Sequence, residues 1–152
     1  TQLLVLTTRT ADEFGYGART VQGGDVAVEG SRIDSVVSSV ELRELVPGAR
    51  VRSWPGVLGP GRVHEGPLPD APSPRERIHA VLKSGATAVL EQYVDSAGLR
   101  AAAARNEVLV LAPDRAPAPA ITERGRADLA VFDETGLCVA TVCAGRLVHR
   151  RR

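Results

Sequence analysis

The chain of 152 residues is 43% hydrophobic and 24% charged, the proportions of one globular domain able to bury a core. Its 19 basic and 18 acidic residues nearly cancel, which argues against a broad basic surface for nucleic acid or an anionic membrane. No stretch approaches the roughly 20 apolar residues of a membrane span, and the N-terminus lacks a signal-peptide layout, so we expect a cytoplasmic protein.

Short strands are predicted along the N-terminal third. Four segments have the apolar runs or alternation of strands: residues 3–6, 25–29, 32–37 and 50–54. Gly30 and Ser31 fit the turn of a hairpin between the middle two. The glycine-rich segment after residue 6 predicts a loop, and residues 41–46 predict a helical turn.

Residues 54–74 differ from both flanks because they hold six of the ten prolines and four glycines. Proline lacks the amide donor that a central strand needs. We therefore predict a mostly irregular connection, in which only residues 57–58 and 62–63 can pair with other strands.

Two helices are predicted in the following segment. Ser73, Pro74 and Glu76 have the order of an N-cap, a first helical proline and a capping-box acid. Asp95 or Ser96 can cap the second helix. The two apolar stripes consist of Ile78, Val81 and Leu82, then Leu99, Ala102 and Ala103.

An apolar segment follows each helix, at residues 86–90 and 108–111. Runs that are apolar on both faces are typical of buried parallel strands. Residues 73–112 therefore predict an αβαβ unit with parallel strands.

The chain returns to antiparallel strands after a Pro/Ala connector at residues 112–120. Gly136 and Gly145 mark the turns between three predicted strands: residues 128–132, 137–143 and 146–149. Cys138 and Cys143 are five residues apart on the second of these, so their side chains should point to opposite faces. We expect two reduced, buried thiols, with neither a disulfide nor a shared metal.

Three segments carry a resemblance to a known family: residues 24–36, 125–133 and 145–148. Their sequences are GDVAVEGSRIDSV, GRADLAVFD and GRLV. In this order they resemble the N-terminal hairpin and the C-terminal strands of the amidohydrolase superfamily, particularly of imidazolonepropionase-like enzymes. The resemblance implies that both chain ends combine into a small β-sandwich beside a catalytic barrel.

The expected fold class is α+β, as a single domain of residues 1–152. Residues 1–56 and 121–152 are expected to form the amidohydrolase-like β-sandwich, and residues 57–120 a truncated, barrel-like αβαβ insert. A complete (β/α)₈ barrel needs about 200 residues or more. The segment SGATAV at residues 84–89 is similar to an early barrel segment of the family, so the first units are expected to remain while most of the barrel is missing.

The first barrel strand departs from the family at its metal-binding positions. The family motif P-G-x-V-[ND]-x-H-x-H aligns its two histidines with Gly66 and Leu68, whose side chains cannot bind a metal. His64 falls where the family has Asn or Asp. The resemblance therefore implies a catalytic barrel without its metal ligands.

His64, Glu65, Asp70 and His79 are the remaining histidines and carboxylates that lie close together in the sequence. A hydrolytic zinc site needs three protein ligands and an open position. His79 lies beside the apolar stripe of its helix, between basic and acidic neighbours, so we favour a solvated helix face over a metal site.

Two other groups of residues are candidates for function. Cys143 with His149 would be a thiol and a base, but nothing in the sequence supplies an orienting group, and packing is the favoured interpretation. Trp54, His64 and Glu65 could form a ligand or partner surface, or belong to a simple linker. The sequence does not separate these two readings.

We therefore favour a non-catalytic, degenerate amidohydrolase-like protein that acts as a binding or accessory module, with no catalytic residue and no cofactor. The alternative is a minimal or split metal-dependent hydrolase of non-peptide C–N bonds in a cyclic or N-heterocyclic substrate, with zinc or another divalent metal. Loss of most of the barrel would expose apolar surface. We accordingly expect a homodimer or an accessory protein partner, and neither nucleic acid nor membrane.

Overall fold

The computed structural model describes residues 3–8, 13–16, 19–22, 24–38, 50–114 and 120–151. These residues form mixed β-sheets with two α-helices, which confirms the α+β class. The expected helical turn at residues 41–46 and the middle of the Pro/Ala connector lie outside the described residues. No described helix has the length and apolar character needed to cross a bilayer.

The elements follow the chain in this order: β1 (Leu3–Thr8), β2 (Glu13–Tyr16), β3 (Arg19–Gln22), β4 (Gly24–Glu29), β5 (Arg32–Ser38), β6 (Arg50–Trp54), β7 (Val57–Pro60), β8 (Arg62–His64), α2 (Pro74–Lys83), β9 (Ala86–Leu90), the 3₁₀ turn η1 (Glu91–Tyr93), α3 (Ala97–Arg105), β10 (Leu109–Leu111), β11 (Leu129–Phe132), β12 (Cys138–Cys143) and β13 (Arg146–Arg150).

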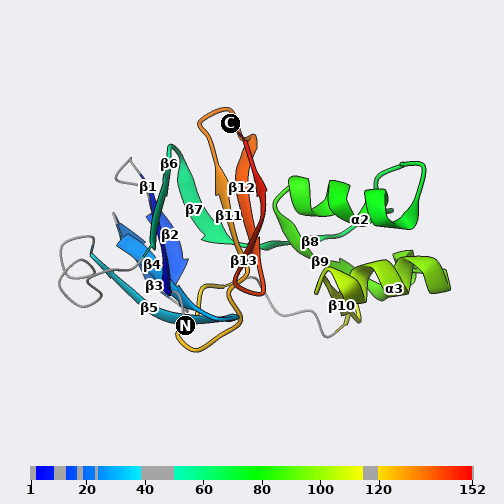
Figure 1. Cartoon of the computed structure of the whole chain (residues 1–152), viewed down its shortest axis with the longest axis horizontal. Helices are drawn as coiled ribbons and strands as arrows, with labels where there is room; N and C mark the ends of the chain where they lie inside the picture. Colours follow the sequence, from blue (N-terminus) through cyan, green and yellow to red (C-terminus); the bar gives the residue numbers. More distant parts are fainter. Residues whose placement is uncertain are drawn as a thin grey trace.

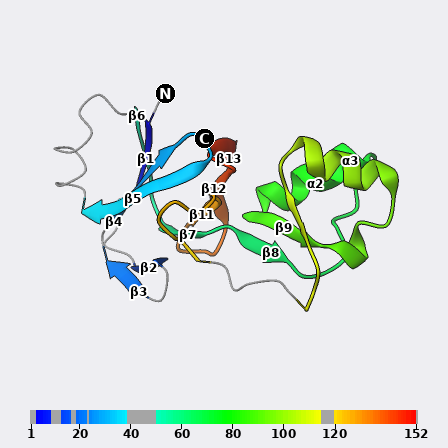
Figure 2. The same cartoon turned by 90° about the horizontal axis from the view of Figure 1, so that it is seen from below.

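Two four-stranded sheets occupy one side of the molecule (Figures 1 and 2). The first has the order β5-β4-β1-β6, in which β1 is antiparallel to β4 and parallel to β6. The second has the order β13-β12-β11-β7 and is antiparallel throughout. We call them the paired sheets. Their strands come from both ends of the chain, as the sequence predicts.

One hydrophobic core joins the paired sheets. Its buried side chains include Val26, Val28 and Ile33 of the first sheet and Leu58, Leu129 and Val131 of the second. Backbone hydrogen bonds reinforce the junction, because the amide of Ile33 donates to the carbonyl of Gly125 at 2.8 Å. The residues before β11 thus tie the two sheets together.

The other side of the molecule is an α/β unit, residues 62–111, made of β8, β9, β10 and the helices α2 and α3 (Figure 1). Its three strands are parallel, in the order β10-β9-β8. Both predicted helix starts are confirmed: Ser73 Oγ accepts from the Glu76 amide at 3.2 Å, and Ser96 Oγ from the Leu99 amide at 3.1 Å. Ser96, not Asp95, is the second cap.

The core of the α/β unit contains both predicted apolar stripes. Helices α2 and α3 pack against each other and cover β9, all of whose residues are buried. The expected αβαβ alternation is confirmed, with a preceding strand, β8, at the predicted pairing segment 62–63.

Three expectations are corrected. The glycine-rich segment after β1 contains the antiparallel hairpin β2–β3, where we expected a loop. Residues 57–60 form β7 and pair with β11, so this part of the expected insert belongs to the paired sheets. The strand β10 is not buried: Leu109 is 39% and Val110 42% exposed, because no strand covers its outer edge among the described residues.

Candidate functional site

The positions where the family resemblance expects metal ligands do not form a metal site. His64 ends β8, and its Nε2 lies 2.9 Å from the carbonyl oxygen of Pro67. Leu68 is only 4% exposed and packs in the core of the α/β unit with Ile78 and Leu99. Because Gly66 has no side chain and Leu68 is held in an apolar core, this donor set does not fit a metal ion.

The other candidate metal ligands do not lie together in the fold. His79 is exposed on α2, and Glu65 and Asp70 are exposed in the connection between β8 and α2. No group of three or more His, Cys, Asp or Glu residues that could hold a metal occurs within the described ranges. Trp54, grouped with His64 and Glu65 as a candidate surface, is 9% exposed and packs in the core of the paired sheets.

Cys143 and His149 have separate surroundings. The Nε2 of His149 lies 3.3 Å from the carbonyl of Cys138. Cys143 is fully buried, and the guanidinium of Arg126 donates to its Sγ at 3.2 Å. Burial, followed by the nearby charge of Asp128, raises the pKa of the Cys143 thiol to about 11. A thiol of this kind is protonated at neutral pH and is a poor nucleophile.

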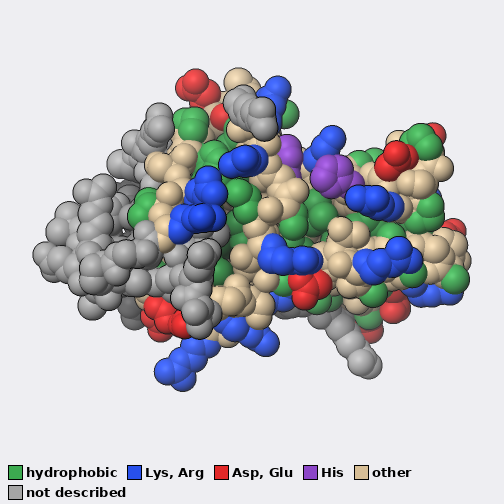
Figure 3. All heavy atoms as spheres, in the orientation of Figure 1, with side chains coloured by type: hydrophobic (Ala, Val, Ile, Leu, Met, Phe, Trp, Pro, Cys, Tyr) green, Lys and Arg blue, Asp and Glu red, His purple; other side chains and the backbone are tan. Residues whose placement is uncertain are grey.

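His149 and His79 are 70 positions apart in the sequence, but the fold places them at the same groove. They line an open groove with Lys83, Arg150 and Arg151, and histidine and basic side chains lie together on this face in Figure 3. Desolvation, and then the charges of Lys83, His149 and Arg75, lower the pKa of His79. The groove is basic, and the side chains of His79, Lys83 and Arg150 that line it are exposed.

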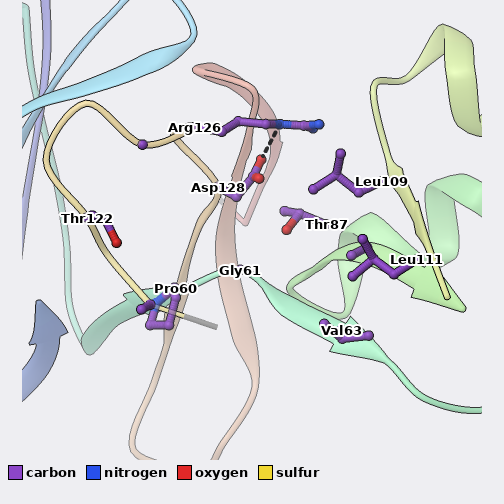
Figure 4. A pocket seen from close by; sticks show the side chains of 12 residues that line it. Pro60, Gly61, Val63, Thr87, Leu109, Leu111, Thr122, Arg126 and Asp128 are labelled. Atoms are coloured by element: carbon purple, nitrogen blue, oxygen red, sulfur yellow. Dashed lines mark hydrogen bonds and ion pairs between the residues drawn. The ribbon is translucent and has the colours of Figure 1, made fainter. Parts of the chain in front are cut away.

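A cavity of about 300 Å³ lies between the α/β unit and the segment that leads into β11 (Figure 4). Pro60 and Gly61 precede β8, Thr87 is near the start of β9, and Leu109 begins β10. Val63 of β8 and Leu111, the last residue of β10, also line it, so the cavity begins near the amino ends of the three parallel strands and extends along them. His64 and the connection that follows it lie at the carboxyl end of β8 and are not part of the cavity lining.

Arg126 and Asp128 line the cavity and form an ion pair, with Arg126 Nε 3.1 Å from Asp128 Oδ1. The same carboxylate oxygen accepts from the Ala144 amide at 2.9 Å. Burial raises the pKa of Asp128, against the opposing effects of the Ala144 hydrogen bond and the Arg126 charge. Arg126 also donates to the carbonyl of Glu107, so it joins the turn after α3 to the paired sheets.

Gly61 lets the chain approach Thr87 closely on the cavity wall. Its amide donates to the carbonyl of Asp128 at 2.8 Å, and a Cβ at this position would lie 2.3 Å from Oγ1 of Thr87. Only glycine leaves this space for Thr87. Sequence reasoning missed the cavity, although a threonine inside an otherwise apolar strand was a signal, because its lining residues come from segments far apart in the chain.

The structure is similar to solved enzymes. E. coli guanine deaminase matches with a TM-score of 0.55 and 17% identity over 74% of this chain. An adenosine deaminase from Xanthomonas campestris with bound zinc matches with 0.53 and 18% over 71%, and guanine deaminase from Bradyrhizobium japonicum with 0.53 and 13% over 74%. No protein-family model and no curated protein matches the sequence.

The match covers only part of each of these enzymes. The chain spans 36%, 33% and 35% of their lengths, about a third in each case. These deaminases belong to the amidohydrolase superfamily, so the fold of this chain is amidohydrolase-like over that part. This confirms the resemblance drawn from residues 24–36, 125–133 and 145–148 at the level of fold.

Proposed function

We propose that the chain is a non-catalytic, amidohydrolase-like binding or accessory module. The observation that carries the proposal is the burial of Leu68 in the core of the α/β unit, at a position where the family motif has a metal-binding histidine. Chemistry in such folds resides in the site residues and not in the fold. In this reading the paired sheets are the family's β-sandwich, and β8, β9 and β10 are the first strands of its barrel.

Metal content tests this function. Protein purified without chelator should hold less than about a tenth of an equivalent of zinc, iron, manganese or nickel. It should also leave guanine and adenosine, the substrates named for the similar enzymes, undeaminated. Close to one equivalent of metal, lost in the His64→Ala variant, would overturn the proposal.

A second candidate is half of a split hydrolase, and the exposed edge of β10 favours it. A further strand could pair with this edge, as β9 pairs with the other side of β10. In that case a partner chain would supply metal ligands, and zinc would bind only to the complex. A purified complex that binds stoichiometric zinc and hydrolyses a C–N bond would replace the first proposal with this one.

The same edge supports a homodimer or a permanent partner. Leu109 and Val110 expose apolar surface along a strand whose outer backbone groups have no strand beside them in the described part of the chain. Unpaired apolar edges are usually covered in proteins. Sedimentation should therefore show association as concentration rises, and a clean monomer at high concentration would contradict it.

A further inference from the structure

The cavity between the α/β unit and the β11 segment contains a buried hydroxyl without a partner. Thr87 is 2% exposed, and its Oγ1 makes no hydrogen bond within the part of the chain described here. Thr141, the other threonine buried among residues whose burial is described, donates its hydroxyl to the carbonyl of Leu82. Buried polar groups in native proteins are almost always paired, so an unpaired one facing a cavity indicates a ligand or an ordered water.

Two charged residues offer further hydrogen-bonding atoms beside Thr87. Oδ1 of Asp128 accepts from Arg126 and Ala144, whereas Oδ2 accepts from no described group. Arg126 uses Nε and Nη2 for its contacts, and Nη1 has no partner among the described residues. Because the two charges are paired, the cavity offers both donors and acceptors without a net charge.

The remaining walls are apolar. In Figure 4 Thr87 lies between Asp128 on one side and Leu109 and Leu111 on the other, and Val63 lies farther along the cavity. A volume of about 300 Å³ is at the lower end of the range for small-molecule sites. Sites of this type bind an apolar body and orient it by a few polar groups.

We propose that this cavity binds a small, uncharged molecule with an apolar body and one hydroxyl group, the chemical class of simple phenols and short alcohols. A hydroxyl donates and accepts at once. It can donate to Oδ2 of Asp128 while it accepts from Oγ1 of Thr87, which pairs both groups. An anionic head would face the carboxylate of Asp128, and a cationic head would face Arg126.

The site is distinct from the position of the family's metal ligands. Neither Gly66 nor Leu68 lines the cavity, and both follow the carboxyl end of β8. This ligand class belongs to the binding module proposed above. Only the expectation that the ligand is bound without being converted rests on that proposed function.

Titration of the purified full chain with p-cresol tests the inference, by calorimetry and by backbone amide NMR. We expect saturable binding of one molecule per chain, with shifts concentrated at Gly61, Thr87 and Leu109. Toluene, which lacks the hydroxyl, and 4-methylbenzoate, which is charged, should each bind at least about tenfold more weakly. Equal binding of toluene, or no saturable binding of p-cresol, would overturn the inference.

The Thr87→Val variant keeps the shape of the side chain and removes its hydroxyl. It should weaken p-cresol binding about tenfold and leave toluene binding unchanged. Val110→Thr, on the same sheet but absent from the cavity lining, is the matched control and should bind p-cresol like the wild type. An unchanged affinity in Thr87→Val would reject the assigned contact and with it the inference.

Metal analysis of the same samples separates this inference from the proposed function. Binding of p-cresol by metal-free protein supports both. Failure to bind in metal-free and zinc-supplemented samples alike overturns the cavity assignment and leaves the non-catalytic function standing. Binding that keeps its dependence on Thr87 in a sample holding stoichiometric zinc supports the site and contradicts the non-catalytic function.

Discussion

Thr141 donates its hydroxyl to the carbonyl oxygen of Leu82 at 2.7 Å, and both residues are fully buried. The bond joins β12 of the paired sheets to the end of α2 in the α/β unit. Gly85 follows on the same boundary, with a positive φ of 90° and no room for a Cβ beside the ring of Phe132. The two units therefore meet through a polar bond and a close packing contact.

Removal of this hydroxyl should destabilise the protein. Thr141→Val should lower the free energy of unfolding by about 1 kcal/mol, since the Leu82 carbonyl loses its side-chain donor. Thr87→Val should be neutral or should stabilise by up to about 1 kcal/mol, because it removes a buried hydroxyl that has no partner. Urea unfolding of both variants checks the contrast, and equal losses would contradict the assigned pairing of the two threonines.

Histidine should be tolerated at one of the two expected ligand positions and rejected at the other. Gly66→His should change stability by less than about 0.5 kcal/mol, because a Cβ there has no atom within 4 Å. Leu68→His should cost about 2 to 4 kcal/mol, because it places an imidazole in an apolar core. Thermal unfolding measures both. A stable Leu68→His variant would mean that the connection can leave the core.

Alkaline pH should destabilise the protein through Cys143. The pKa of this thiol is about 11 in the folded chain against an ordinary value of 9.0. The unfolded chain therefore releases the proton first, so stability from this group is complete below pH 9 and is lost as pH rises through about 11, by about 3 kcal/mol.

Comparison with Cys143→Ala isolates this contribution. The stability of the variant, measured by denaturant at several pH values, should fall less steeply above pH 9 than that of the wild type. Reaction of the wild-type thiol with a disulfide reagent should require unfolding. Identical pH slopes in the two proteins would show that the buried thiol does not titrate as described.

A charge on the open edge should reduce self-association. Val110 is 42% exposed on β10, and Val110→Lys would place an ammonium group on the strand that has no outer neighbour in the described ranges. Sedimentation should show a weaker dimer, by at least about tenfold in Kd. Arg150→Lys, on the exposed end of β13, should not change association. Equal weakening by both variants would move the interface away from β10.

The elements best predicted from the sequence are those with local signals. Ser73 and Ser96 cap helices because a serine oxygen three residues ahead of a free amide can accept from it, whatever the tertiary fold. The hairpin β2–β3 was missed, since its glycines have the composition of a loop. The exposure of β10 was missed because an apolar run has the same sequence whether or not a neighbouring strand covers it.

The cavity could not be predicted for a different reason. Thr87, Arg126 and Asp128 belong to segments about 40 residues apart, and only the packing of the two units brings them together. The family motif pointed to residues 125–133 as a part of the sheet structure, which is correct, but it did not show that Arg126 and Asp128 also line a space. Long-range contacts of this kind have no periodicity in the sequence.

The hydrogen bond between the Gly61 amide and the Asp128 carbonyl, at 2.8 Å, joins the two chain segments that flank the α/β unit in the sequence. The chain leaves the paired sheets at Gly61 and rejoins them from Ile121 onward, since Ile121 packs in their core and the Gly125 carbonyl accepts from the Ile33 amide. The contacts at this junction do not depend on the number of residues in the α/β unit between its two ends. A larger or smaller number of α/β units between Gly61 and Ile121 would therefore leave every strand of the paired sheets with the same neighbours.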